Sequence, residues 1–96
     1  MKKLTYQISD FPNLAAHELC ALVKGRFKGG DVTVARSKHV IARYNGIVFT
    51  ASTHAEGMTV VVTIPWYLNN KSVVSRVKRE VPSLITSIRE AYNELV

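Results

Sequence analysis

Residues 43–49 read Arg-Tyr-Asn-Gly-Ile-Val-Phe, and this stretch decides the fold of the chain. An Asn-Gly pair between strand-forming residues is typical of a two-residue hairpin turn, because both residues tolerate the positive φ angles that a type I′ turn requires. A turn of this length fixes how the two strands pair. It puts six side chains on one face of a sheet as three opposed pairs: Tyr44 with Ile47, Ala42 with Phe49, and Val40 with Ala51.

The next turn predicts the same face for the following strand. With Glu56-Gly57 as its loop, Ala55 lies opposite Met58. Three further residues, Phe49, Ala51 and Thr53, then line up with Ile64, Val62 and Val60. The opposite face carries His39, Ile41, Arg43, Val48, Thr50, Ser52, His54, Thr59, Val61 and Thr63. Agreement between two turns supports this assignment of faces.

The turn around residues 36–38 leaves two registers open. A three-residue loop puts Val32 and Val34 on the core side of the sheet, and a two-residue loop puts them outside. Burial of two valines favours the longer loop.

The first 30 residues predict a strand and a helix. Residues 3–8 alternate apolar and polar side chains, which is typical of a half-buried strand. A helix is expected to start within residues 9–12, since Ser9 or Asp10 can cap free backbone N–H groups and Pro12 suits a first turn. Its end is expected between Lys24 and Lys28. Its apolar stripe is Ala16, Leu19, Cys20, Val23 and Phe27.

The last third predicts a long helix over residues 71–95, capped within residues 69–72. Pro82 removes a backbone hydrogen bond, so we expect a kink or a break near Glu80. Before this helix, Trp66 and Tyr67 could form a stacking platform, but the sequence favours their closing the end of the core.

The element order is therefore β-α-β-β-β-β-α over residues 1–96, which we expect to form a single domain. Hairpins and two amphipathic helices indicate an α+β fold with one antiparallel sheet and both helices on one face. No element is left to cover the other face.

This order, with an open face rich in Val and Thr, resembles one repeat of the TATA-box-binding-protein-like fold over the whole chain. That fold also occurs in accessory domains of some DNA glycosylases and type three ribonucleases H. The TATA-box-binding protein itself uses two repeats and paired phenylalanines that wedge between bases. Here Phe49 faces the core and Phe27 lies at a helix end, which argues against DNA kinking of that kind.

Composition and motifs exclude several classes of protein. The chain is 47% hydrophobic, too apolar for a disordered protein. Its apolar runs are far shorter than the roughly 20 residues of a membrane span, and we expect no targeting segment, no membrane association and a cytoplasmic location. One cysteine, Cys20, excludes a disulfide framework.

The candidate chemical groups do not form a catalytic set. His39 and His54 share a face without a carboxylate, His17 lies off the helix stripe, and Cys20 lies on it. We therefore expect no enzymatic activity, no metal site and no cofactor.

Charge points to binding. Residues 24–43 hold six basic residues and one acidic residue, a net +5 of the chain's +6, whereas basic and acidic residues nearly cancel from Phe49 onward. A concentrated positive charge attracts polyanions, which predicts low-specificity nucleic-acid binding by a basic segment and the open sheet face. The candidate residues are Lys24, Arg26, Lys28, Arg36, Lys38, His39, Arg43, Thr50, Ser52, His54 and Thr63.

Two alternatives stay open. The open face could be an ordinary solvated surface, because Thr and Val also occur there for their strand preference. The chain could instead be a protein–protein interaction module of bacterial or phage type, acting as a homodimer or docking on a partner protein through the open face or a sheet edge.

Overall fold

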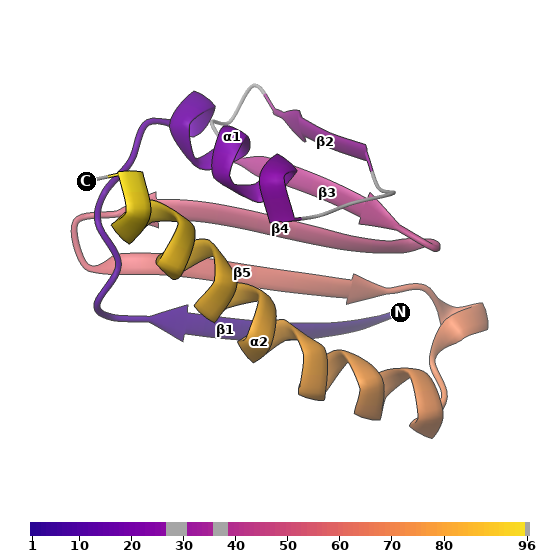
Figure 1. Ribbon diagram of the computed structural model, residues 1–96. Coiled ribbons are helices and arrows are strands. Elements are labelled where there is room, and N and C mark those ends of the chain that lie inside the picture. Colours follow the sequence, from indigo (N-terminus) through magenta and orange to yellow (C-terminus); the bar gives the residue numbers. More distant parts are fainter. Residues whose placement is uncertain (27–30, 36–38, 96) are drawn as a thin grey trace.

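Five strands form one open antiparallel sheet, and two helices cover one of its faces in the computed structural model (Figure 1). The structure describes residues 1–26, 31–35 and 39–95. The sheet order is β1-β5-β4-β3-β2, which confirms the predicted α+β fold. The elements are β1 (Lys2–Ile8), α1 (Ala16–Arg26), β2 (Asp31–Val34), β3 (Val40–Tyr44), β4 (Ile47–His54), β5 (Gly57–Ile64), the 3-10 helix η1 (Trp66–Leu68) and α2 (Lys71–Leu95).

The hairpin between β3 and β4 has the predicted turn and register. Asn45 and Gly46 both have positive φ, +50° and +82°, as a type I′ turn requires. All five pairs from Tyr44 with Ile47 to Val40 with Ala51 are present. The Asn-Gly pair therefore sets the faces of the central strands.

The predicted pairing of β4 with β5 is wrong by two residues. Thr53 lies opposite Met58, and His54 lies opposite Gly57, so the turn consists of Ala55 and Glu56. Gly57 belongs to the strand because β1 approaches it so closely that any side chain there would overlap the Ile8 carbonyl. A shift of two residues leaves each side chain on its predicted face.

The register between β2 and β3 is that of the longer loop. Val34 pairs with Val40 and Val32 pairs with Ala42, so both β2 valines have the core-side parity. Val32 is buried, but Val34 stays 45% exposed at the end of this edge strand.

Helix α1 starts at Ala16, several residues later than predicted. The Thr53 hydroxyl accepts a hydrogen bond from the Leu14 N–H (2.9 Å) and donates one to the Leu14 carbonyl (2.8 Å), which holds this segment out of the helix. Phe11, expected in the first turn, is buried in the core instead. Burial of a large aromatic side chain therefore outweighs the preference of Pro12 for a helix start. Over the described residues α1 extends to Arg26, and the rest of the interval predicted for its end lies outside them.

Helix α2 runs without a break from Lys71 to Leu95, so of the kink or break predicted near Glu80 the break is absent. Its start is capped as expected, by the Asn70 side chain, which accepts a hydrogen bond from the Val73 N–H at 3.0 Å. Pro82 lies on the exposed side, where water can bond the carbonyl that the proline ring leaves without a partner. The buried residues Val77, Val81 and Ile88 hold both halves of the helix to the sheet.

The core lies between the helices and the sheet. Its buried members are Phe11, Leu19, Cys20, Leu22, Val23, Val32, Val40, Ala42, Ala51, Met58, Val60, Val62, Ile64, Val77, Val81 and Ile88. Phe49 was predicted to be buried with them and is only half-buried. The molecule measures 39 × 25 × 25 Å, and the strands and α2 extend along its long dimension (Figure 1).

Candidate nucleic-acid interface

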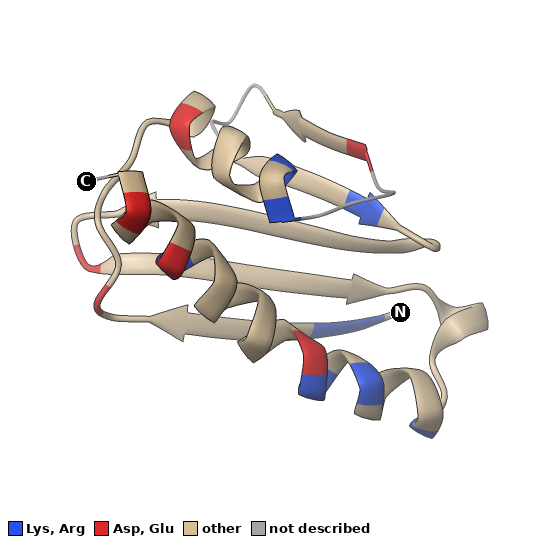
Figure 2. Ribbon diagram, viewed as in Figure 1, with Lys and Arg blue, Asp and Glu red and all other residues tan. Residues whose placement is uncertain are grey.

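Charges are segregated along the long axis of the molecule (Figure 2). One end is formed by the β3–β4 turn, η1, the start of β1 and the first half of α2, and the end of α1 points toward it (Figure 1). We call this the basic end. Its cations are Lys2, Lys3, Arg43, Lys71, Arg76, Lys78 and Arg79, and its acids are Asp31 and Glu80. Lys24 and Arg26, in the last turn of α1, lie between the two ends of the molecule.

The opposite end is acidic. It contains the turn after β1, the first turn of α1, the β4–β5 turn and the last turns of α2 (Figure 1). These segments carry Asp10, Glu18, Glu56, Glu90 and Glu94, with Arg89 among them. Because the acids of α2 that follow Glu80 lie at this far end, they do not neutralise the cations in its first turns.

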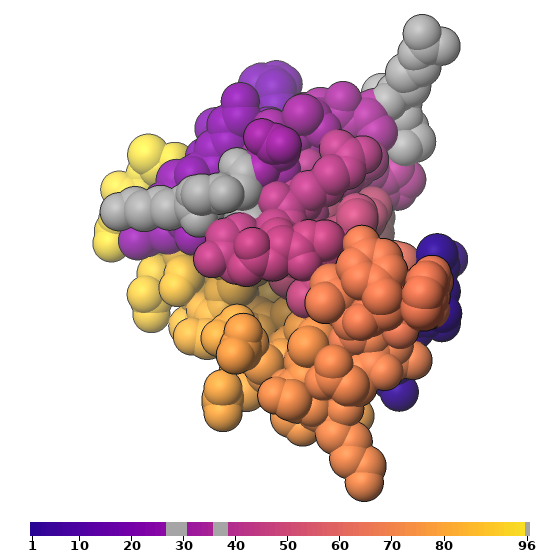
Figure 3. Space-filling model, turned by 90° about the vertical axis from the view of Figure 1, so that its right-hand side faces the viewer, coloured from indigo at the N-terminus to yellow at the C-terminus, as the bar shows by residue number. Residues whose placement is uncertain are grey.

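The β3–β4 turn packs against η1 at the basic end. A Cβ atom on Gly46 would lie 3.1 Å from Leu68 Cδ1 and 3.4 Å from the Tyr67 hydroxyl. The absence of a side chain at Gly46 therefore lets the turn pack closely against η1, in addition to allowing the positive φ of the turn. Figure 3 shows the turn (magenta) and the segment after β5 (orange) together on this end of the molecule.

Two aromatic rings of η1 are exposed beside this contact. Trp66 is 79% exposed and Tyr67 is 61% exposed, so the expectation that they close the core is wrong. The half-buried Leu68 packs against the core instead. The two rings meet edge to face, with centroids 5.6 Å apart and planes at 86°. We call Trp66 and Tyr67 the aromatic corner.

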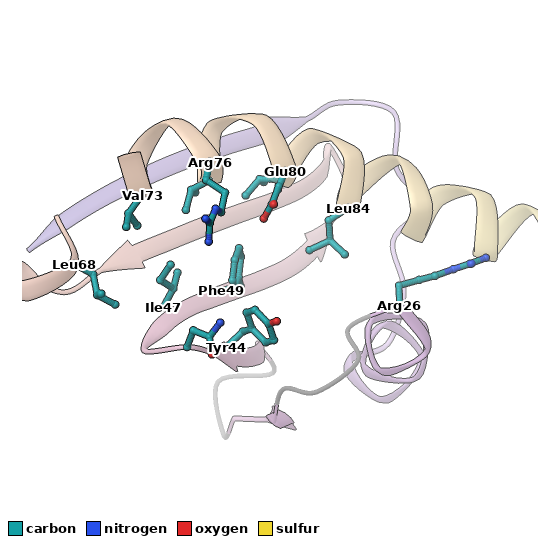
Figure 4. Close-up of a pocket in the computed structure, with 12 residues that line it drawn as sticks. Arg26, Tyr44, Ile47, Phe49, Leu68, Val73, Arg76, Glu80 and Leu84 are labelled. Carbon is teal, nitrogen blue, oxygen red and sulfur yellow. The ribbon is translucent and has the colours of Figure 1, made fainter. Parts of the chain in front are cut away.

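A groove opens between α2 and the β3–β4 hairpin on the helical side of the sheet (Figure 4). Its volume is about 430 Å³, within the size range of ligand sites. Phe49 projects into it from β4, and Arg76 projects into it from α2 (Figure 4). This explains why Phe49 is only half-buried. The lining residues are Arg26, Tyr44, Asn45, Ile47, Phe49, Leu68, Val73, Arg76, Val77, Glu80, Val81 and Leu84.

Arg26 lies at the margin of this groove and points away from its centre (Figure 4). Its guanidinium group lies 3.7 Å from the Glu94 carboxylate, in an exposed ion pair. This partner lowers the charge that Arg26 offers to a ligand. Arg76 is therefore the better placed of the two groove arginines.

The remaining predicted site residues divide between two faces. Arg43, Thr50, Ser52, His54 and Thr63 lie on the predicted face of the sheet, which the helices leave open. The sheet separates them from Lys24 on α1. His39 precedes β3, and Lys28, Arg36 and Lys38 lie outside the described residues.

His54 has a structural role in the β4–β5 hairpin. Its Nδ1 accepts a hydrogen bond from the Glu56 N–H at 3.2 Å, which leaves the ring proton on Nε2 to be donated to the Thr59 hydroxyl at 3.0 Å. Both ring nitrogens are therefore engaged. In the part of the chain that the structure describes, no three His, Cys, Asp or Glu side chains group as metal ligands.

The basic end includes Arg76, Lys78 and Arg79 of α2, which are exposed. The sequence favours an ordinary solvated surface for these three residues, because charge counted over the C-terminal half as a whole nearly cancels. The order of charges along the helix contains the missing signal, since Lys71, Arg76, Lys78 and Arg79 precede Glu90 and Glu94.

Comparisons with protein-family models, with curated proteins and with solved structures found no match to this chain. Over the described residues, no helix is both long and apolar enough to cross a membrane.

Proposed function

We propose that this protein binds nucleic acid at its basic end through contacts with phosphates, without reading base sequence. The observation that carries the proposal is the segregation of charge: seven of the ten described Lys and Arg residues belong to the basic end, against two of the seven acids. A surface of one sign raises the local concentration of a polyanion and orients its approach. The acidic end would be repelled by the same ligand.

The distribution of the cations favours phosphate contacts over base readout. They come from β1, β3 and α2, and Arg76 projects into the groove between elements (Figures 2 and 4). Reading bases in duplex DNA needs several side chains presented together by one element that enters the major groove. Cations spread over several elements are instead suited to contacts with a phosphate backbone.

The test is salt-dependent binding of a labelled 20-base-pair duplex, measured by fluorescence anisotropy. Each phosphate contact on duplex DNA contributes about −0.9 to the slope of log K against log salt concentration, so four contacts give a slope near −3.6. Arg76→Gln should weaken binding and flatten the slope by about one. Absence of binding at about 50 mM salt would refute the proposal.

Arg89→Gln is the matched control. It removes the same charge from the acidic end, where Arg89 lies over the Phe11 ring at 6.0 Å. Its binding slope should equal that of the unmodified protein. Equal losses for the two variants would show that net charge, and not the basic end, governs binding.

A homodimer formed by the open sheet faces is a second candidate. Ile41, Val48 and Val61 are half-buried on a face that no helix covers, and two copies would bury them. The segregated charge favours antiparallel pairing, because the basic end of one copy then lies over the acidic end of the other. This arrangement leaves the groove on the helical side accessible.

A further inference from the structure

We infer that the nucleic acid held at the basic end is single-stranded, and that its bases stack on the aromatic corner. This inference rests on the proposed function and specifies its ligand. It begins from Trp66, whose large apolar side chain is 79% exposed although the neighbouring Leu68 packs against the core. A Trp left in water at a charged surface indicates a role in binding more often than one in stability.

The rings of the aromatic corner are held in place. The Leu68 N–H donates a hydrogen bond to the Pro65 carbonyl at 3.0 Å, which fixes the turn that carries both rings. Tyr67 lies against Gly46 of the β3–β4 turn, and Trp66 lies edge to face with Tyr67. A ring that is ordered before binding loses little conformational entropy when a base stacks on it.

Two segments that carry cations adjoin the segment of the aromatic corner. Lys2 pairs with Ile64, two residues before Trp66, and Lys71 opens α2 three residues after Leu68. The start of β1 (indigo) lies beside the segment after β5 (orange) in Figure 3. Phosphates accompany every stacked base, and these segments supply positive charge near the rings.

The exposed rings distinguish a single strand from a duplex. Bases inside a duplex already stack on one another, whereas an unpaired base can stack on an aromatic side chain. A membrane surface fits less well, because the polar residues Asn69 and Asn70 follow the corner within three residues in the chain. The aromatic corner therefore favours an unpaired strand.

Trp66 is the single tryptophan of the chain, so tryptophan fluorescence, excited selectively over the four tyrosines, reports on this corner alone. The probes are a 12-nucleotide single strand of mixed sequence, the same sequence as a duplex, and vesicles of phosphatidylcholine and phosphatidylserine. We expect the single strand to quench the fluorescence and to bind at least about 10-fold more tightly than the duplex at equal salt. A blue shift with vesicles and no change with the single strand would overturn the inference in favour of a membrane surface.

Variants separate stacking from charge, with affinities measured on labelled probes. Trp66→Ala should weaken single-strand binding by about 5- to 150-fold, the range for loss of one stacking ring, and leave duplex binding within about twofold. Trp66→Phe should restore most of the loss. Leu95→Ala, which alters an equally exposed apolar side chain at the acidic end, should change neither affinity.

The outcomes distinguish this inference from the proposed function. If the single strand and the duplex bind equally and Trp66→Ala affects neither, the inference is overturned and phosphate binding at the basic end stands. If neither probe binds to the unmodified protein, both are overturned.

Discussion

Gly57 is required by a close approach between strands. Its φ is +134°, a conformation that side-chain-bearing residues rarely adopt, and the backbone of Ile8 and Ser9 occupies the space of a side chain. In the sequence this glycine resembles a turn residue, because it follows Glu56 at a hairpin. The pattern of alternation predicts which face a residue occupies, but it contains no information on the distance between β1 and β5.

Gly57→Ala should lower the free energy of unfolding by more than about 2 kcal/mol, through backbone strain and overlap with Ile8. The measurement is denaturation by urea. Gly25→Ala is the matched control: Gly25 lies within α1 with open space around its Cα, so alanine should stabilise by about 0.5–1 kcal/mol. Unchanged or raised stability of Gly57→Ala would contradict the close approach.

Thr53 fixes the segment before α1 through its two hydrogen bonds with Leu14. Thr53→Val keeps the shape of the side chain and leaves a partly buried N–H and carbonyl without this partner, so we expect a loss of about 1–3 kcal/mol in stability. Thr50→Val on the open face should change stability by less than about 0.5 kcal/mol. Equal urea midpoints for the two variants would show that the Leu14 bonds contribute little.

Helix α2 accommodates a proline that was predicted to interrupt it. Pro82 does remove one backbone hydrogen bond of the helix, as predicted. The contacts of Val77, Val81 and Ile88 with the core stabilise the helix by more than this loss. At the start of α1, tertiary packing prevents a helix that local preference favours, because burial of Phe11 outweighs the local signals for a helix start. Local preferences predict that a helix exists better than where it begins or bends.

Pro82→Ala should raise the stability of the protein by about 1–3 kcal/mol, because proline is about 3 kcal/mol less favourable than alanine within a helix. The gain is smaller than this difference, since alanine also increases the freedom of the unfolded chain. Ser83→Ala, at the neighbouring exposed position, should change stability by less than about 0.5 kcal/mol. A loss of stability in Pro82→Ala would indicate that the ring makes a contact the helix needs.

At the scale of the whole molecule, the sequence predicted the order of elements and both faces of the sheet, but only part of the candidate site. The Asn45-Gly46 turn and the alternation of strand residues are local signals, and the faces follow from them. The basic end joins Lys2, Arg43 and Arg76, which are far apart in the chain. When the fold brings cations from distant parts of the chain together, counting charge within short stretches of sequence does not find the site they form.

The dimer candidate predicts a mass of twice 10.7 kDa by light scattering at micromolar protein concentration. Val61→Lys, in the middle of the open face, should then give the mass of one chain, because the ammonium group cannot be buried between two sheets. Ser83→Lys, at an exposed position of α2 on the helical side of the sheet, should leave the dimer in place. The mass of one chain for the unmodified protein would reject this candidate.

The pairing of β1 with β5 has a consequence for folding. The three hairpins from β2 to β5 join neighbours in the chain, whereas Lys2 meets Ile64 across almost two-thirds of it. Closing so long a loop costs more entropy than closing a tight turn, so we expect β1 to dock after the hairpins have formed. Until then, β5 presents the unpaired edge of a strand that contains Met58, Val60, Val62 and Ile64. Aggregation during refolding should therefore begin at β5, and β1 acts as the intramolecular chaperone of that edge.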